Sequence, residues 1–287
     1  MRASDRRRRK LIHRFGRFPY TDELGQKGWF GRLARAQPHE VRRLPLTIDG
    51  WPRGIRPLRV AFLSDFHVGS HTGDVARLES IVAETSAARP DLVLLGGDFM
   101  NMQPLGGGRV APRRIAAVLG GIDAPLGRFA VLGNHDVSYG SAEVEAALRT
   151  AGIEVLHDVT RPIAFEGRAF AIAGLPDARI RRDGAMSLLQ RLHADRPSLV
   201  LAHDPFWFAH MPSGPHLMLA GHTHGGQIRL PMIGALVNMS AAPLRWSYGL
   251  IEEGGRRLYV TSGIGTSGIP LRLGIPPEIV LIEISGA

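Results

Sequence analysis

From residue 57 onward, short apolar runs alternate with longer segments in which apolar residues recur at helical spacing. The runs are rich in Val, Leu and Ile, which is typical of buried strands. Because strands alternate with helices, we expect an α/β fold whose sheets are largely parallel or mixed. The predicted strands are 59–64, 92–95, 129–132, 169–173, 198–202, 217–220, 257–261 and 279–284, and the predicted helices are 74–89, 112–120, 142–151 and 184–193.

Five of the predicted strands end in clusters of Asp, Asn and His. In α/β folds, ligands bind at the carboxyl ends of strands, so clusters that share one edge converge on one cavity. Neutral imidazole is the commonest metal ligand in proteins. The clusters are Asp65-Phe66-His67, Gly96-Gly97-Asp98, Gly133-Asn134-His135-Asp136, His203-Asp204-Pro205 and Gly221-His222-Thr223-His224.

The ligand inventory suits two divalent ions held close together. A carboxylate has two oxygens and can bridge two cations, and such paired ions polarise a phosphoryl group for attack. Taken singly, each cluster is more often an ordinary turn. All five in order, each at the end of a strand, favour a metal site.

The absence of cysteine restricts the metal ligands to nitrogen and oxygen. Manganese is the favoured ion because carboxylate and amide oxygens are prominent, and iron, zinc and nickel remain alternatives. With 287 residues and 44% hydrophobic content, the chain suffices for one large domain or two modest ones.

The positive charge of the chain lies near its N-terminus. Residues 1–60 hold 16 Lys or Arg and 5 Asp or Glu, a net charge of +11, whereas residues 61–287 hold 19 and 21, a net charge of −2. We therefore divide the chain into a basic, aromatic-rich arm at 1–56 and a domain at 57–287.

The arm has the composition of a segment that binds an anionic membrane surface. Leu11, Phe15 and Phe18 recur at helical spacing after a run of five basic residues, and Pro19 would end that helix. We expect residues 1–45 to contact such a surface, with a disordered arm as the alternative and nucleic acid less favoured. Neither a signal peptide nor a membrane-spanning stretch is recognisable, so a cytoplasmic protein, peripheral at the inner face of the cytoplasmic membrane, is expected.

The ordered ligand clusters resemble those of the calcineurin-like metallophosphoesterase superfamily, over about residues 57–287. The segment Gly221–Gln227, and the segment 262–272 ahead of Pro276-Pro277-Glu278, are similar to a bacterial phosphodiesterase branch. That branch includes YkuE- and YaeI-like proteins and UDP-2,3-diacylglucosamine hydrolases. The resemblance implies a four-layer αββα sandwich of two mixed β-sheets.

The resemblance also implies roles for the clustered residues. Asp65, His67 and His224 would hold one metal, Asn134, His203 and His222 the other, and Asp98 would bridge them. His135 would not ligate, but would stabilise the phosphoryl group and protonate the leaving oxygen. Asp136 would orient His135 or cap the next helix. The nucleophile would be a metal-bridging hydroxide.

Other residues are candidates for contact with a substrate. His71 lies in the same loop as His67, and Arg272 suits bidentate contact with phosphate; an ordinary loop histidine and a surface arginine are the alternatives. Met211, Met232, Trp246 and Leu271 would line an apolar lipid pocket or belong to the core. The remaining histidines are expected to be structural.

The leading hypothesis is a di-metal phosphoesterase that hydrolyses a phosphodiester or pyrophosphate. A lipid-linked or nucleotide-sugar substrate, such as UDP-2,3-diacylglucosamine in lipid A biosynthesis, fits the basic arm. A general or cyclic-nucleotide phosphodiesterase and a nuclease are alternatives within the enzyme class. A catalytically silent metal-binding scaffold is the alternative outside it, although such a protein should have lost ligands or His135, and none is missing.

Overall fold

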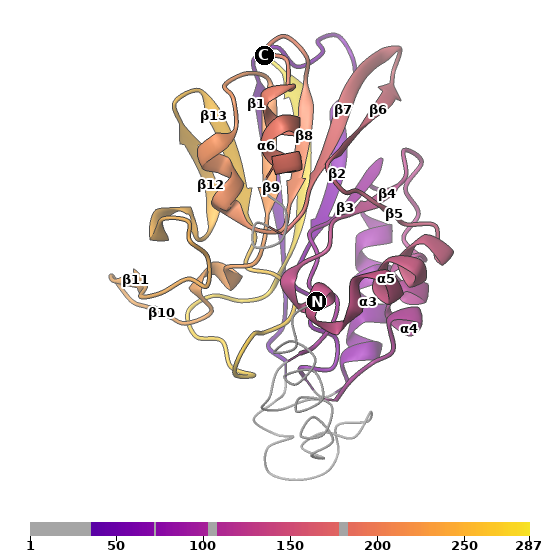
Figure 1. Cartoon of the computed structure of the whole chain (residues 1–287), viewed down its shortest axis with the longest axis vertical. Coiled ribbons are helices and arrows are strands. Elements are labelled where there is room, and N and C mark those ends of the chain that lie inside the picture. Colours follow the sequence, from indigo (N-terminus) through magenta and orange to yellow (C-terminus); the bar gives the residue numbers. More distant parts are fainter. Residues whose placement is uncertain (1–35, 72, 103–107, 178–182) are drawn as a thin grey trace.

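The computed structural model describes residues 36–71, 73–102, 108–177 and 183–287 (Figure 1). These residues form two six-stranded sheets and a two-stranded hairpin. The helix predicted around Leu11, Phe15 and Phe18 lies outside the described residues. Every strand and helix predicted from residue 57 onward is present, and apart from the start of one helix the ends differ by a few residues.

The first sheet has the strand order β1-β14-β2-β3-β4-β5. All neighbouring strands are parallel except β14 and β2, so the sheet is mixed. Its strands are β1 (Glu40–Ile48), β14 (Glu278–Gly286), β2 (Leu58–Leu63), β3 (Leu92–Leu95), β4 (Arg128–Ala130) and β5 (Glu154–Val155).

The second sheet has the strand order β12-β13-β9-β8-β7-β6. The pairs at its two edges are antiparallel and the inner pairs are parallel, so it too is mixed. Its strands are β12 (Gly249–Glu253), β13 (Arg256–Val260), β9 (His216–Ala220), β8 (Ser198–Ala202), β7 (Arg168–Leu175) and β6 (Val159–Phe165). The separate hairpin pairs β10 (Arg229–Leu230) with β11 (Gly234–Ala235).

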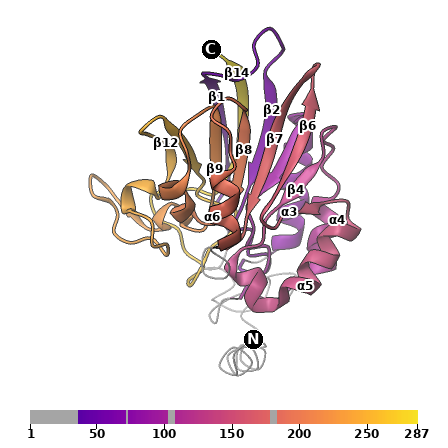
Figure 2. The same cartoon turned by 45° about the horizontal axis from the view of Figure 1, so that its top comes forward.

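Alternation of side chains along the strands builds four layers. In β2, Val60 and Phe62 lie in the apolar core between the sheets, whereas Ala61 and Leu63 face helices α3 (Asp74–Ala87), α4 (Pro112–Leu119) and α5 (Asn134–Thr150). On the other side, Met218 of β9 packs in a third apolar cluster with residues of α6 (Asp183–Gln190). The helices therefore cover opposite outer faces (Figure 2), which confirms the predicted αββα sandwich.

Strand β1 lies in the part of the chain that the sequence assigned to the basic arm. Glu40–Ile48 pairs in parallel with β14 along its whole length, so the folded body includes these residues. Because β1 is an edge strand, only Leu46 and Ile48 are buried, and Pro45 and the charged residues before it are tolerated. The weak apolar pattern of an edge strand is why the sequence placed the domain boundary at residue 57.

Helix α5 begins at Asn134, eight residues earlier than its apolar pattern predicts. Gly140 interrupts the helical backbone with φ 147° and ψ 91°, and the polar residues before it read as a turn. One of the ligand clusters is therefore the first turn of a helix. The backbone N–H groups and the positive end of the helix dipole face the site there. No helix of the described residues is both long and apolar enough to cross a bilayer.

Ion pairs between a buried carboxylate and two half-exposed arginines link the start of β3 to β2 and to the segment before it. Asp91 is 3% exposed, and its carboxylate accepts hydrogen bonds from Arg56 Nη1 at 2.8 Å and from the Arg59 backbone N–H at 2.9 Å. Burial alone would raise the pKa of Asp91, but the hydrogen bonds from Arg56 and Arg59 outweigh it and lower the pKa.

Replacing Asp91 with asparagine should destabilise the fold by about 1–3 kcal/mol at neutral pH. Since the folded-state pKa lies below the unfolded one, this contribution is present above the unfolded pKa and disappears as the pH falls through the folded pKa. Urea unfolding at pH 7 and near pH 3 should show a difference from wild type that shrinks at the lower pH. Asp123→Asn, at an exposed position, should shift the midpoint little; equal effects of the two substitutions would contradict the prediction.

Candidate metal centre

The five predicted ligand clusters come together at one end of the two sheets (Figure 1). Each follows the carboxyl end of β2, β3, β4, β8 or β9, so both sheets contribute. Three overlapping groups have ligand atoms that all lie within 4.8 Å of one another: Asp65, His67 and His224; Asp98, His203 and His222; and His67, Asp98 and His135.

The backbone at the candidate ligands has an unusual conformation. Left-handed φ values cost L-residues roughly 1–2 kcal/mol each, and such strain concentrates at functional sites. Methyl groups added at Gly133 and Gly221 would overlap the carboxylates of Asp98 and Asp65, respectively. Of the ten non-glycine residues with positive φ among the described residues, five are candidate ligands: Asp65, His67, Asp98, His222 and His224.

The first group places two buried imidazoles against two carboxylates. His67 Nε2 lies 3.1 Å from His224 Nε2 and 3.6 Å from Asp98 Oδ2, and His224 Nε2 lies 3.6 Å from Asp65 Oδ1. Burial, reinforced by the positive charge of His135, lowers the pKa of His67 to about 3. Burial also lowers the pKa of His224 well below its usual value. Both rings are therefore neutral at physiological pH and have a lone pair for a metal.

Backbone carbonyls orient the two histidines of the second group. His203 Nδ1 donates to the Gly96 carbonyl at 2.8 Å, and His222 Nε2 donates to the Met239 carbonyl at 3.0 Å. These bonds place the protons on the outer nitrogens, as for metal-ligating histidines in general. The inner nitrogens, His203 Nε2 and His222 Nδ1, then present lone pairs to the site.

Four acceptor atoms converge where these inner nitrogens meet. His203 Nε2 lies 3.1 Å from His222 Nδ1, 3.2 Å from Asn134 Oδ1 and 3.4 Å from Asp98 Oδ2. Four such atoms around one point favour a cation between them, which is either a proton on His203 Nε2 or a metal ion. Burial would lower the pKa of His203, yet the charges of Asp98 and Asp65 raise it well above its usual value, so this position favours positive charge. The donor set fits a divalent cation.

Asp136 has the contacts of a helix cap. Its buried carboxylate accepts backbone hydrogen bonds from Gly133 at 2.9 Å, from Asp98 at 2.8 Å and from Met100 at 3.1 Å. These bonds fasten the start of α5 to the loop that follows β3. Of the two roles expected for Asp136, capping is the one that these contacts match.

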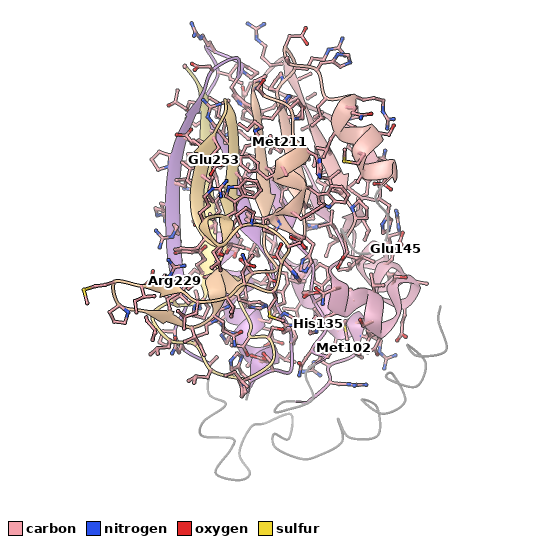
Figure 3. The ribbon with its side chains drawn as sticks, turned by 60° about the vertical axis from the view of Figure 1, so that its left-hand side comes forward. Met102, His135, Glu145, Met211, Arg229 and Glu253 are labelled. Carbon is pink, nitrogen blue, oxygen red and sulfur yellow. The ribbon has the colours of Figure 1, made fainter. Side chains whose placement is uncertain are left out.

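His135 lies at the edge of the metal-ligand groups. Its backbone N–H donates to Asp98 Oδ1 at 2.7 Å, and its ring meets the His67 ring edge-on with centroids 4.5 Å apart. His135 is only partly buried, whereas His67 and Asp98 are fully buried, and it lies toward the lower end of the molecule in Figure 3. This position suits a residue that acts on the substrate beside the metals.

Arg272 is buried inside the site rather than exposed on the surface. It is 3% exposed, and its guanidinium donates to the carbonyls of Ser262 at 2.6 Å, Gly263 at 3.2 Å and Gly265 at 2.5 Å. One Nη also lies 3.4 Å from His224 Nδ1. The prediction of a substrate contact does not match this geometry, because the donors already serve carbonyls. Arg272 instead braces the loop behind His224.

The other proposed substrate contacts separate into buried and exposed residues. His71 is buried, with Nδ1 3.0 Å from Ser70 Oγ and Nε2 3.4 Å from Thr266 Oγ1, so it links two loops. Of the candidates for an apolar pocket, Met211 and Trp246 belong to the core, whereas Met232 and Leu271 are exposed.

Two functional groups could not be predicted from the sequence because they are backbone carbonyls. Gly96 and Met239 orient the second pair of histidines through their main-chain oxygens. No residue type in a sequence indicates which backbone carbonyl will accept a hydrogen bond from a ligand histidine. Only the paired glycines at 96–97 give a hint, since glycine permits close approach of the backbone.

Comparison with known proteins agrees with this geometry. The family model of the calcineurin-like phosphoesterases matches residues 58–226. The uncharacterized metallophosphoesterase YkuE of Bacillus subtilis is 26% identical over 90% of this chain and 90% of its own. Phosphodiesterase YaeI of Escherichia coli is 34% identical over 89% of this chain and 92% of its own. A transmembrane protein with metallophosphoesterase domain from Danio rerio is 32% identical over 90% of this chain and 60% of its own. The chain therefore belongs to the calcineurin-like phosphoesterase family and is a metal-dependent phosphoester hydrolase.

Proposed function

We propose that the chain hydrolyses a phosphodiester or a pyrophosphate with two divalent ions bound at the candidate metal centre. The observation that carries this proposal is the convergence of three acceptor atoms on His203 Nε2, next to a second group of three ligands. Two such ions, when bound, polarise the phosphoryl group and activate the attacking water. The name of the relative YaeI, a phosphodiesterase, supports a diester over a monoester.

The position of each residue in the centre suggests its role. Asp98 belongs to groups on both sides, which fits a bridging carboxylate. His135, at the exposed edge, donates a proton to the leaving oxygen. One ion would be held by Asp65, His67 and His224, and the other by Asn134, His203 and His222. Manganese is the favoured ion, because the set includes three side-chain oxygen donors beside the imidazoles.

The substrate is a phosphorylated small molecule, and we propose a lipid-linked or nucleotide-sugar diphosphate such as UDP-2,3-diacylglucosamine. The basic N-terminal segment supports a substrate at an anionic membrane surface. The name of the Danio rerio relative, which places that protein in a membrane, supports the same location. A general or cyclic-nucleotide phosphodiesterase is the second candidate, favoured by the partly exposed position of His135.

Hydrolysis of bis(p-nitrophenyl) phosphate by the purified protein tests the activity. We expect turnover that depends on added manganese and exceeds the turnover of p-nitrophenyl phosphate. A panel of nucleotide sugars, acylated nucleotide sugars and cyclic nucleotides then identifies the substrate. If no ester is cleaved with manganese, iron, zinc or nickel, the protein is the silent scaffold and the proposal fails.

Replacing Arg6, Arg7, Arg8, Arg9 and Lys10 with glutamine should weaken binding to anionic vesicles. Each basic residue near such a surface contributes on the order of 1 kcal/mol, so the loss should be roughly tenfold or more at low salt. Substitution is preferable to deletion of residues 1–45, because that deletion would remove most of strand β1. Sedimentation with phosphatidylglycerol vesicles measures the effect; unchanged binding would reject a membrane role for the arm.

A further inference from the structure

We propose that an apolar surface beside the metal centre docks on an anionic lipid bilayer and presents the centre to phosphoester groups at the headgroup level. Docking does not depend on the proposed function, whereas delivery of a phosphoester to the centre rests on it. We call this surface the apolar rim. Eight of the ten large hydrophobic side chains that are exposed among the described residues belong to it: Met232, Ile233, Leu236, Val237, Met239, Ile269, Leu271 and Leu273.

The rim consists of two segments, residues 232–239 and 269–273. Hydrogen bonds next to these segments hold them together as one surface. Gln227 Nε2 donates to the carbonyls of Ser267 at 3.0 Å and Ile269 at 3.1 Å, and the Arg229 N–H donates to the Leu273 carbonyl at 2.8 Å. The first segment begins in the β10–β11 hairpin, which projects from the body of the protein (Figure 1). Contiguous exposed apolar residues of this kind mark an interaction site, unlike the scattered ones found on every protein.

The rim is directly connected to the metal centre. The Met239 carbonyl accepts the hydrogen bond from His222 Nε2 at 3.0 Å, although the Met239 side chain is 72% exposed. At the other end, Gln227 follows His224 by three residues. Arg229, at the base of the hairpin, and His135 lie at the same end of the molecule in Figure 3. A bilayer that receives the rim therefore has its headgroup phosphates next to the centre.

The charge around the rim favours an anionic bilayer as the occupant. The sequence contains no Asp or Glu between Asp204 and Glu252, and none between Glu253 and Glu278. Both rim segments lie within these stretches, so they carry no carboxylate that anionic headgroups would repel. Lipid surfaces of this kind attract segments that combine apolar side chains with positive charge.

The first described residues of the chain contact the rim. Gln37 Nε2 donates to the Arg272 carbonyl at 2.8 Å, between the exposed side chains of Leu271 and Leu273. Residues 1–35, which precede this contact, hold 11 Lys or Arg and 3 Asp or Glu. A positively charged segment that enters beside an apolar surface supplies the second attraction that stable peripheral binding requires.

Site-specific fluorescence tests the docking on the full-length protein. The natural chain has no cysteine, so Met232→Cys gives a single site for acrylodan on the rim, and Leu250→Cys gives a matched exposed site on β12. With vesicles of phosphatidylcholine and phosphatidylglycerol, we expect a blue shift of the probe at 232 and none at 250. A probe at 232 that does not shift, or equal shifts at both positions, would overturn the proposal.

Vesicle sedimentation of a second variant keeps the test quantitative. Met232→Ser with Ile233→Ser should lower the affinity for anionic vesicles roughly tenfold, whereas Leu250→Ser should change it little. Neither rim substitution touches the metal ligands, so hydrolysis of the soluble diester should stay at the wild-type rate. Wild-type protein that dimerises through the rim in velocity sedimentation, and binds no vesicles, would show that a second copy is the occupant and would refute docking.

The outcomes for docking and for catalysis are separable. A blue shift at 232 without hydrolysis of any phosphoester would retain docking and reject the proposed function. Hydrolysis of the soluble diester without vesicle binding would retain the proposed function and reject docking. Protein treated with a chelator should show the same blue shift, because the rim does not need the metals to be exposed.

Discussion

Replacing Asp98 with asparagine should reduce the metal content and nearly abolish hydrolysis. Asparagine keeps an oxygen for the His135 N–H but removes the negative charge that faces both groups of histidines. Burial would raise the pKa of Asp98, but His203 and His135 outweigh it and lower the pKa well below its usual value, so the wild-type side chain is ionised at pH 7. Substitution of residues that only hydrogen-bond to metal ligands already lowers metal affinity about 10–100-fold. For Asp98 itself we therefore expect a loss of metal affinity of more than about 100-fold.

Metal analysis after dialysis and calorimetric titration with manganese measure this effect. Circular dichroism shows whether the variant retains its fold, and Asp123→Asn serves as the control for loss of a carboxylate at an exposed position. Full occupancy by two ions together with wild-type kcat/KM would mean that Asp98 does not bridge them. Loss of one ion alone would place Asp98 at a single metal.

Replacing His135 with alanine should lower kcat by roughly 10²–10⁴-fold while metal binding stays intact, since general acid catalysis contributes about that much. The backbone N–H that donates to Asp98 is retained in the variant, so the first turn of α5 keeps its contact with the metal ligands.

The dependence on the leaving group identifies the role of His135. A p-nitrophenolate leaves without a proton, whereas an alkoxide needs one, so the loss should be larger for alkyl diesters than for nitrophenyl diesters. Steady-state kinetics on both substrates, with metal content measured in parallel, provide the comparison. An equal loss for the two leaving groups would argue against proton donation, and an unchanged kcat would remove His135 from the mechanism.

The inner strands could be predicted because both of their faces are buried. Leu92–Leu95 of β3 faces the second sheet and the helices alternately, so every residue is apolar and the run is plain in the sequence. Edge strand β1 buries Leu46 and Ile48 only, which leaves too weak a pattern to recognise. The early start of α5 was missed for another reason: its first turn is held by the Asp136 carboxylate, and its first residues are polar because they face the site.

The roles of Arg272 and the rim depended on contacts between distant segments. By residue type alone, an arginine in a glycine-rich loop is a reasonable phosphate ligand. Only the folded structure shows that its guanidinium donates to the carbonyls of residues 262, 263 and 265 instead. Likewise, Met211 and Met232 are the same residue type, yet one lies in the core and the other is fully exposed on a hairpin.

The sequence by itself determined the fold class, the order of the strands along the chain and the residue types available to a metal. These properties are local, because a buried strand and the turn after it are each encoded by a few consecutive residues. Only the tertiary structure decided which ligands face one another, which nitrogen of each histidine points inward, and which apolar side chains remain outside. Those properties depend on segments far apart in the sequence, such as His67 and His224, which are 157 residues apart, and no short stretch of sequence specifies them.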